Sequence, residues 1–214
     1  MKTSLSELLE SGRPVITDGA MGTVLFALGL ERGSVPDLLN VERPELIRQV
    51  HRSYIEAGSQ IILTNSFGGS RVRLGTHGMP ERAAGLNAAA AVLARAEADA
   101  APRGVLVGGD IGPTGLLLKP YGDLTFEEAT AAFEEQIRAL AAGGVDAIWI
   151  ETMYDLEEVR AAVEAAHRAA PELPVVATMT FDAHGRTMMG TTPEQAVEVL
   201  SGLGVAALAG NCGN

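Results

Sequence analysis

The chain has 214 residues, a formal net charge of −11 and 47% hydrophobic residues, which fits one globular domain with a substantial core. A nucleic-acid-binding surface is excluded because phosphate contacts need an excess of Lys and Arg. No apolar stretch approaches the roughly 18 residues of a membrane span, and the N-terminus lacks the apolar core of a secretory signal. The single cysteine, Cys212, cannot form an internal disulfide, so we expect a cytoplasmic protein.

Six short apolar runs predict β-strands, with helical segments between them. Each run is almost wholly apolar rather than alternating, which is typical of strands buried on both faces of a parallel sheet. In chain order, the runs are Pro14–Thr17, Gln60–Leu63, Val105–Gly108, Ala147–Ile150, Val175–Thr178 and Val205–Ala209.

The helical segments have recognisable ends. Glu42–Gly58 has Pro44 near its start and Gly58 at its end, the expected asymmetry of helix termini. Three later segments begin with a capping residue followed three positions on by Glu or Gln, which predicts a capping box. The pairs are Thr125 with Glu128 for Thr125–Gly143, Asp155 with Glu158 for Leu156–Ala170, and Thr192 with Gln195 before Leu200.

The repeated order of strand and helix predicts an α/β protein with a parallel sheet, either doubly wound or closed into a (β/α)8 TIM barrel. Polar or small residues follow every predicted strand, which favours a barrel, where all strand ends meet on one catalytic face. A doubly wound sheet would concentrate them at one switch point. Because a barrel needs eight strands and about 250 residues, we expect residues 1–214 to be one barrel domain that is truncated after strand six and lacks its last two βα units.

Two loops after predicted strands offer neutral hydrogen-bonding groups. In TDGAMGT, Gly19 and Gly22 would let the backbone turn and present N–H groups to a ligand carboxylate, and a plain glycine turn is an equal alternative. In LTNSFGGSR, Thr64 and Asn65 can orient a small polar molecule, and a helix-capping loop is as consistent with these residues.

Three further residues stand at strand ends. Asp110, in GGDIGPTG, is interpreted as a residue that caps or holds a loop. Glu151, in WIETM, follows a buried strand and needs a partner there, either the ammonium group of a substrate or a nearby Arg or helix N-terminus. Cys212 follows the last run, but a lone cysteine is most often a small buried hydrophobe, and it has no clustered histidines or thiolates that would complete a zinc site.

Taken in order, six motifs resemble those of the homocysteine S-methyltransferase family, over about Ser4 to Asn214. They are DGAMGT, HRSYIEAGSQIILTNSFG, GDIGPTG, ETM, MTFDAHGRTMMGT and GNCG. The likeness is greatest to the N-terminal, homocysteine-binding barrel of the family's cobalamin-dependent branch. It implies a (β/α)8 barrel that binds homocysteine and activates it as a thiolate on zinc, for methyl transfer to form methionine.

The resemblance also implies roles for particular residues. The substrate-binding residues that it implies are Asp18, Gly19, Ala20, Thr64, Asn65 and Glu151. Among them, Glu151 would pair with the ammonium group of homocysteine. Cys212 matches the first of three zinc-binding cysteines, and the other two are expected beyond residue 214. We therefore expect this chain alone to be inactive.

The cobalamin-dependent branch implies methylcobalamin as the methyl donor, on another domain or chain, and corrinoid- and folate-binding domains or proteins as partners. Relatives that use S-methylmethionine or betaine directly leave the donor open. Two other classes also stay open: a non-catalytic barrel fragment that binds a small amino acid, and an unrelated barrel enzyme that acts on a phosphorylated substrate. Bound zinc would separate the enzyme from the non-catalytic fragment.

Overall fold

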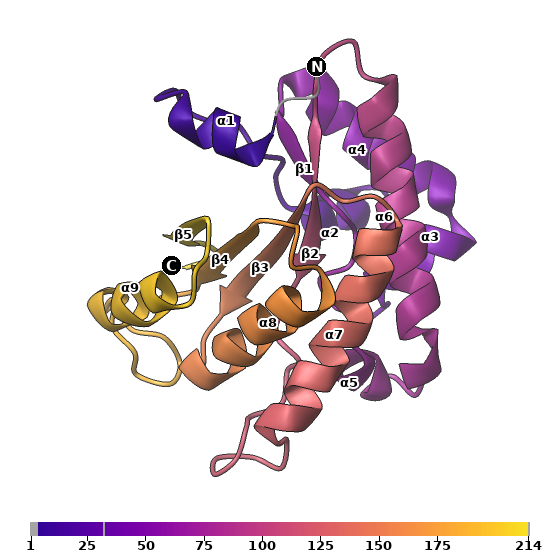
Figure 1. Cartoon of the computed structure of the whole chain (residues 1–214). Coiled ribbons are helices and arrows are strands. Elements are labelled where there is room, and N and C mark those ends of the chain that lie inside the picture. Colours follow the sequence, from indigo (N-terminus) through magenta and orange to yellow (C-terminus); the bar gives the residue numbers. More distant parts are fainter. Residues whose placement is uncertain (1–3, 32, 214) are drawn as a thin grey trace.

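Five parallel strands form one sheet in the computed structural model, which describes residues 4–31 and 33–213 (Figure 1). The strands pair in chain order, so each lies next to its neighbour in sequence. They are β1 (Ile61–Leu63), β2 (Leu106–Ile111), β3 (Ala147–Met153), β4 (Val175–Met179) and β5 (Ala207–Gly210). The predicted α/β architecture with a parallel sheet is confirmed.

The helical elements lie before and between these strands and include two short 3-10 helices. The helical elements are α1 (Leu5–Glu10), α2 (Met21–Ala27), η1 (Pro36–Leu38), α3 (Leu39–Glu42), α4 (Pro44–Ala57), α5 (Arg71–Gly75), η2 (Pro80–Arg82), α6 (Ala83–Ala100), α7 (Phe126–Ala142), α8 (Leu156–Ala169) and α9 (Pro193–Gly202). In Figure 1, α6, α7 and α8 lie along one side of the sheet, and α7 contacts both of the others. Sequential strand order suits the wall of a barrel, because a doubly wound sheet reverses its order at a switch point. The described residues do not close this sheet into a barrel.

The first predicted strand, Pro14–Thr17, is not a strand of this sheet, so the prediction of six strands is wrong. Thr17 alone forms an isolated parallel bridge, to Ile61 of β1. The backbone N–H of Ile16 donates to the side-chain oxygen of Gln60 at 3.2 Å rather than to a neighbouring strand, and the proline of this segment has no N–H to donate. The segment therefore lies beside β1 without a regular ladder, and a truncation after strand six is not confirmed.

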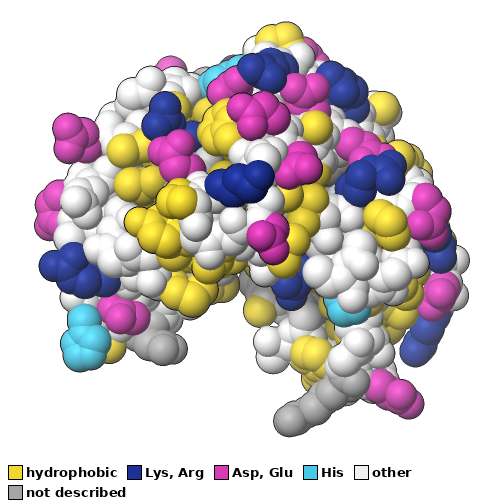
Figure 2. Space-filling model, turned by 90° about the horizontal axis from the view of Figure 1, so that it is seen from below, with side chains coloured by type: hydrophobic (Ala, Val, Ile, Leu, Met, Phe, Trp, Pro, Cys, Tyr) yellow, Lys and Arg dark blue, Asp and Glu magenta, His cyan; other side chains and the backbone are white. Residues whose placement is uncertain are grey.

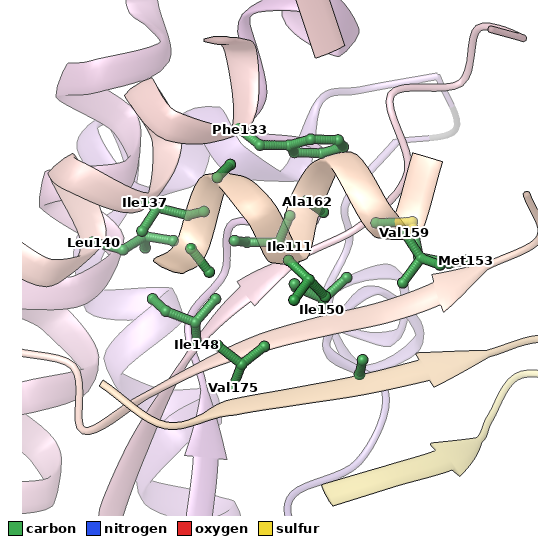
Figure 3. Packing of buried hydrophobic residues seen from close by; sticks show 14 of the residues in the cluster. Ile111, Phe133, Ile137, Leu140, Ile148, Ile150, Met153, Val159, Ala162 and Val175 are labelled. Atoms are coloured by element: carbon green, nitrogen blue, oxygen red, sulfur yellow. The ribbon is translucent and has the colours of Figure 1, made fainter. Parts of the chain in front are cut away.

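Side chains pack against both faces of the sheet. On the face toward the helices, Ile111 and Ile150 of the strands pack with Phe133 of α7 in the largest buried cluster (Figure 3). A smaller cluster forms on the opposite face. Its buried members are Leu5, Ile61, Leu106, Ala147 and Val176. Burial on both faces explains why the strands are nearly continuous apolar runs.

Three predicted helix ends are confirmed. Gly58 directly follows α4 in the left-handed conformation, with φ of 115°, which glycine adopts most easily. Thr125 and Glu128 form a capping box at the start of α7, and Thr192 and Gln195 form one at the start of α9. These ends fix where the loops at the strand ends begin and finish.

The capping box predicted for Asp155 and Glu158 is wrong. Asp155 caps α8 by accepting a hydrogen bond from the backbone N–H of Glu157 at 2.9 Å. Glu158 turns into the interior, where its Oε1 accepts hydrogen bonds from the backbone N–H and the hydroxyl of Thr114, at 2.8 and 2.5 Å. This contact satisfies two donors of the loop after β2, and it joins that loop to α8.

Replacing Glu158 by Gln is expected to stabilise the protein at about pH 8 and to leave its stability nearly unchanged at about pH 4. Burial raises the pKa of the Glu158 carboxyl to about 6, against the opposing hydrogen bonds from Thr114. Because the folded state binds this proton more tightly, the contribution to stability is present below the ordinary pKa and is lost as the pH rises through 6. The gain for Glu158→Gln at about pH 8 is about 2 kcal/mol, measured as the free energy of unfolding in urea.

The exposed neighbour provides the control for this comparison. Glu157→Gln is expected to change the free energy of unfolding by less than about 0.5 kcal/mol at both pH values. Equal effects of Glu158→Gln at the two pH values would contradict the role assigned to the buried carboxyl.

The surface gives two general results. No helix in the described part of the chain is long and apolar enough to cross a membrane. On the face seen in Figure 2, basic and acidic side chains are interspersed, with hydrophobic side chains between them. This face therefore carries no extended basic area of the kind that binds nucleic acid.

Candidate functional site

A cavity of about 820 Å³ opens at the carboxyl ends of the strands. It brings together every residue for which the sequence predicts binding of substrate or metal. These are Asp18, Gly19, Ala20, Thr64, Asn65, Glu151 and Cys212. Convergence of strand-end loops on one cavity is what a barrel mouth requires, and the individual ligand roles of these residues stay predictions.

Alternation along the strands decides which side chains enter the cavity. In β2 and β3, Asp110, Trp149 and Glu151 line the cavity, whereas Ile111 and Ile150 belong to the core toward the helices. Successive side chains of a regular strand point to opposite faces, so Trp149 and Glu151, two positions apart, both reach the cavity. Trp149 is the only tryptophan of the chain, and its position makes its fluorescence a reporter of ligand binding.

Asp18 enters the cavity with one oxygen already bonded. Its Oδ2 accepts a hydrogen bond from the backbone N–H of Leu63 at 2.8 Å. Burial raises the pKa of the Asp18 carboxyl to about 7, the bond from Leu63 opposes this rise, and the negative charge of Glu151 adds to it. Near neutral pH, Asp18 is therefore divided between its charged and neutral forms.

Asp110 and Glu151 bring two more carboxyl groups into the same cavity. Burial raises the pKa of Asp110 well above its ordinary value, and the charges of Glu151 and Asp18 raise it further. Burial also raises the pKa of Glu151. A positively charged ligand group between these carboxylates would favour their charged forms and relieve their mutual repulsion.

Asp37 is a fourth carboxyl group that lines the cavity, alongside Arg73. It is 3% exposed, and its Oδ1 has no hydrogen-bond partner among the described residues. Burial raises the pKa of Asp37 to about 6, while hydrogen bonds from its own backbone and from that of Gly68, and the charge of Arg73, oppose the rise. Four carboxyl groups therefore line the cavity, whereas a single amino acid bound there would bring one ammonium group.

Asn211, immediately before Cys212, ties the last three strands together. Its Oδ1 accepts hydrogen bonds from the backbone N–H of Thr152 at 3.0 Å and from the hydroxyl of Thr178 at 2.7 Å. Its Nδ2 donates to Oε2 of Glu151 at 3.1 Å and to the hydroxyl of Thr152 at 2.9 Å. Thr152 has φ of 60° where the register of β3 shifts, so Asn211 supports a backbone conformation that is rare for threonine.

Thr64 and Asn65 bond mainly within the protein. The hydroxyl of Thr64 accepts a hydrogen bond from the backbone N–H of Asp110 at 2.9 Å and lies 2.6 Å from the hydroxyl of Ser66. Asn65 donates from Nδ2 to the carbonyl of Pro36 at 2.9 Å. Both side chains therefore hold the loops in place, and direct contact with a substrate stays a prediction.

The loop from Asp18 to Ala20 presents main-chain groups to the cavity. A Cβ at Gly19 would lie 2.9 Å from the hydroxyl oxygen of Tyr54, so a larger residue there would displace that side chain. The backbone N–H groups of Gly19 and Ala20 donate to no other described residue, so they are available to a ligand carboxylate. Gly22 lies in the first turn of α2, and the turn predicted there does not form.

Cys212 follows β5 with an exposed side chain and φ of 50°. Its Sγ lies 3.6 Å from Nδ2 of Asn211. Within residues 4–31 and 33–213, no three His, Cys, Asp or Glu side chains group together in a way that could hold a metal ion. Zinc takes three or four protein ligands, so the residues described do not fit a complete zinc site.

The sequence did not assign several side chains of the site, among them Asp37, Asp110 and Asn211. Asp110 is predicted to have a structural role, and its main chain has one, but its carboxyl group lines the cavity. The signal was the alternation of β2, which gives Asp110 the same facing as Leu106 and Gly108. Asn211 carried no signal beyond its place next to Cys212.

Comparisons with known proteins identify the family of the chain. The family model for homocysteine S-methyltransferase matches residues 15–214. Two relatives named methionine synthase, from Mycobacterium tuberculosis (strain ATCC 25618 / H37Rv) and Mycobacterium leprae (strain TN), are 34% and 32% identical over 223 and 225 residues. Each alignment covers 98% of this chain and 18% of the relative, so the chain spans about a fifth of their length.

Solved structures of a smaller protein are also similar. The homocysteine methyltransferase MmuM from Escherichia coli matches in its oxidized form with a TM-score of 0.83 at 29% identity, over 96% of this chain and 75% of that one. Its metallated form matches with a TM-score of 0.82 at 28% identity, over 96% and 77%. Since the family model spans nearly the whole sequence, the chain belongs to the homocysteine S-methyltransferase family.

Proposed function

We propose that this chain is the homocysteine-binding domain of a methyltransferase that forms methionine. One observation carries the proposal: in a chain of this family, a single cavity joins buried carboxyl groups, free backbone N–H groups and Cys212. A small zwitterion with a thiol needs groups of these three kinds. The names of the relatives, methionine synthase and homocysteine methyltransferase, support the same substrate.

Different residues of the cavity would bind the carboxylate, the ammonium group and the thiol of homocysteine. The N–H groups of Gly19 and Ala20 would bind the carboxylate of the ligand, while Glu151 and Asp18 would accept hydrogen bonds from its ammonium group. Asn211 holds Glu151 in place through its Oε2 and leaves Oε1 for the ligand. The thiol would then point toward Cys212.

Cys212 is proposed as one ligand of a zinc ion. Because the described residues supply no complete set of ligands, the remaining donors would come from residues outside those described. A metallated form of MmuM, a similar structure, supports the proposal that the chain binds a metal.

Methylcobalamin is proposed as the methyl donor, carried on another domain or chain. The support is the likeness to methionine synthases, of which this chain spans 18%. Corrinoid- and folate-binding domains would then be its partners, and a cytoplasmic location belongs to the same proposal.

The purified protein is expected to bind L-homocysteine, with a dissociation constant of about 1 μM to 1 mM. Binding should change the fluorescence of Trp149 saturably, because this side chain lines the cavity. Isothermal titration calorimetry under reducing conditions provides the second measurement. Absence of saturation at about 10 mM by both methods, well above this range, would sink the proposal, and saturable binding of inorganic phosphate instead would favour the unrelated barrel enzyme.

A further inference from the structure

The candidate cavity is larger than one homocysteine molecule. Its volume is about 820 Å³. Homocysteine fills roughly 240 Å³ if each of its non-hydrogen atoms takes the ~30 Å³ of a water molecule in the liquid. Because a methyl transfer needs a methyl donor close to the thiol, the remaining volume is available to this second substrate.

The part of the cavity beyond the strand ends has basic side chains in its lining. This part is formed by residues 33–37, by Phe67 and Gly68, by Arg73 of α5 and by His77, which follows α5. It therefore differs in charge from the strand ends, where carboxyl groups line the cavity.

The guanidinium group of Arg73 has no hydrogen-bond or ion-pair partner among the described residues. By contrast, Arg71 on the same helix donates to both carboxylate oxygens of Glu135, at 2.6 and 2.7 Å. Asp37 lies within reach of the charge of Arg73: burial raises its pKa and this charge opposes the rise, yet its Oδ1 has no hydrogen-bond partner in the described part of the chain. The N–H donors of Arg73 are therefore available to a ligand.

The loop after β2 holds this guanidinium group in place. Gly115 of the loop has φ of 80°, which favours glycine, and a Cβ there would overlap Nη1 of Arg73 and lie 3.2 Å from its Cζ. The guanidinium group thus packs against the main chain of the loop. A guanidinium group in a fixed position offers a planar fork of donors that matches two oxygens of a carboxylate or a phosphate.

We propose that Arg73, together with His77, is an anion-binding subsite for the methyl donor. This inference rests on the proposed function. It assigns the two parts of the cavity to two substrates: the strand ends to homocysteine, and Arg73 to the negatively charged group of the donor. Phosphate and carboxylate share this chemistry, since cobalamin carries a phosphate in its nucleotide and betaine carries a carboxylate.

The test uses two pairs of probes that differ in the anionic group. Methylcobalamin is compared with methylcobinamide, which lacks the nucleotide and its phosphate, and betaine is compared with choline, which lacks the carboxylate. The dissociation constants are measured by isothermal titration calorimetry at low salt, with about 10 mM L-homocysteine present. We expect the unsubstituted protein to prefer the anionic member of one pair by about tenfold or more, and Arg73→Gln to reduce that preference by about tenfold.

The pair that responds identifies the anion. A reduced preference for methylcobalamin identifies the phosphate, whereas a reduced preference for betaine identifies the carboxylate and a direct methyl donor. Because the Arg73 side chain is exposed, the variant should fold, which an unchanged circular dichroism spectrum and urea midpoint would show.

Arg71→Gln is the matched control, since Arg71 lies on the same helix but does not line this cavity. It should change either preference by less than about twofold. The inference is overturned, and homocysteine binding left intact, by any of three results: no preference in the unsubstituted protein, an unchanged preference in Arg73→Gln, or an equal loss in both variants. Failure of the unsubstituted protein to bind homocysteine would overturn the proposed function and the inference together.

Discussion

Glu151→Gln is expected to weaken homocysteine binding by about 30-fold, which corresponds to about 2 kcal/mol of binding free energy. The substitution keeps the size of the side chain and an oxygen that can accept the hydrogen bond from Asn211. It removes the charge that would pair with the ammonium group inside a cavity where water competes poorly. Isothermal titration calorimetry at about pH 8, above the raised pKa of Asp18 near 7, measures the change.

An exposed glutamate provides the comparison for this result. Glu127→Gln, at the start of α7, lies outside the cavity and should leave the dissociation constant within about twofold of its original value. If Glu151→Gln binds homocysteine as well as the unsubstituted protein does, Glu151 does not contact the ammonium group.

Phe133→Ala is expected to lower the free energy of unfolding by about 3–5 kcal/mol. Phe133 is 0% exposed and is among the largest fully buried side chains, where α7 packs on the sheet (Figure 3). Removing its ring leaves a cavity that helices and strands packed on several sides cannot refill. Urea unfolding followed by circular dichroism provides the measurement.

Val92→Ala is the control for this core substitution. Val92 lies on α6 with 54% of its surface exposed, so its replacement should change the free energy of unfolding by less than about 0.5 kcal/mol. A loss below about 1 kcal/mol in Phe133→Ala would show that the core relaxes around the gap.

The sheet could be predicted because its strands are buried on both faces, which leaves continuous apolar runs such as Val175–Thr178. The predictions failed where a contact distant in sequence decided the outcome. Pro14–Thr17 is apolar enough for a strand, but Gln60 takes the N–H of Ile16. Glu158 fits a capping box locally, yet Thr114 offers it two donors in the interior.

For the site, the polar residues after each strand predicted which loops would line the cavity. They did not predict which atoms face it. The strand β2 runs to Ile111, past the glycine pair at which the prediction ended, and this extension gives Asp110 its facing. The role of Asn211 depends on the unusual backbone of Thr152, which no local pattern in the sequence indicates.

The residues that line the cavity lie in segments that are far apart in the chain. Asp18 precedes α2, Asp110 lies in β2 and Glu151 lies in β3. No local piece of structure contains the binding site, so the site exists only when the whole sheet is assembled. Thermodynamic linkage then spreads the free energy of ligand binding over the entire fold. An occupied cavity would slow amide hydrogen exchange along β1, β2 and β3 together, because each of these strands must open for the ligand to be released by unfolding.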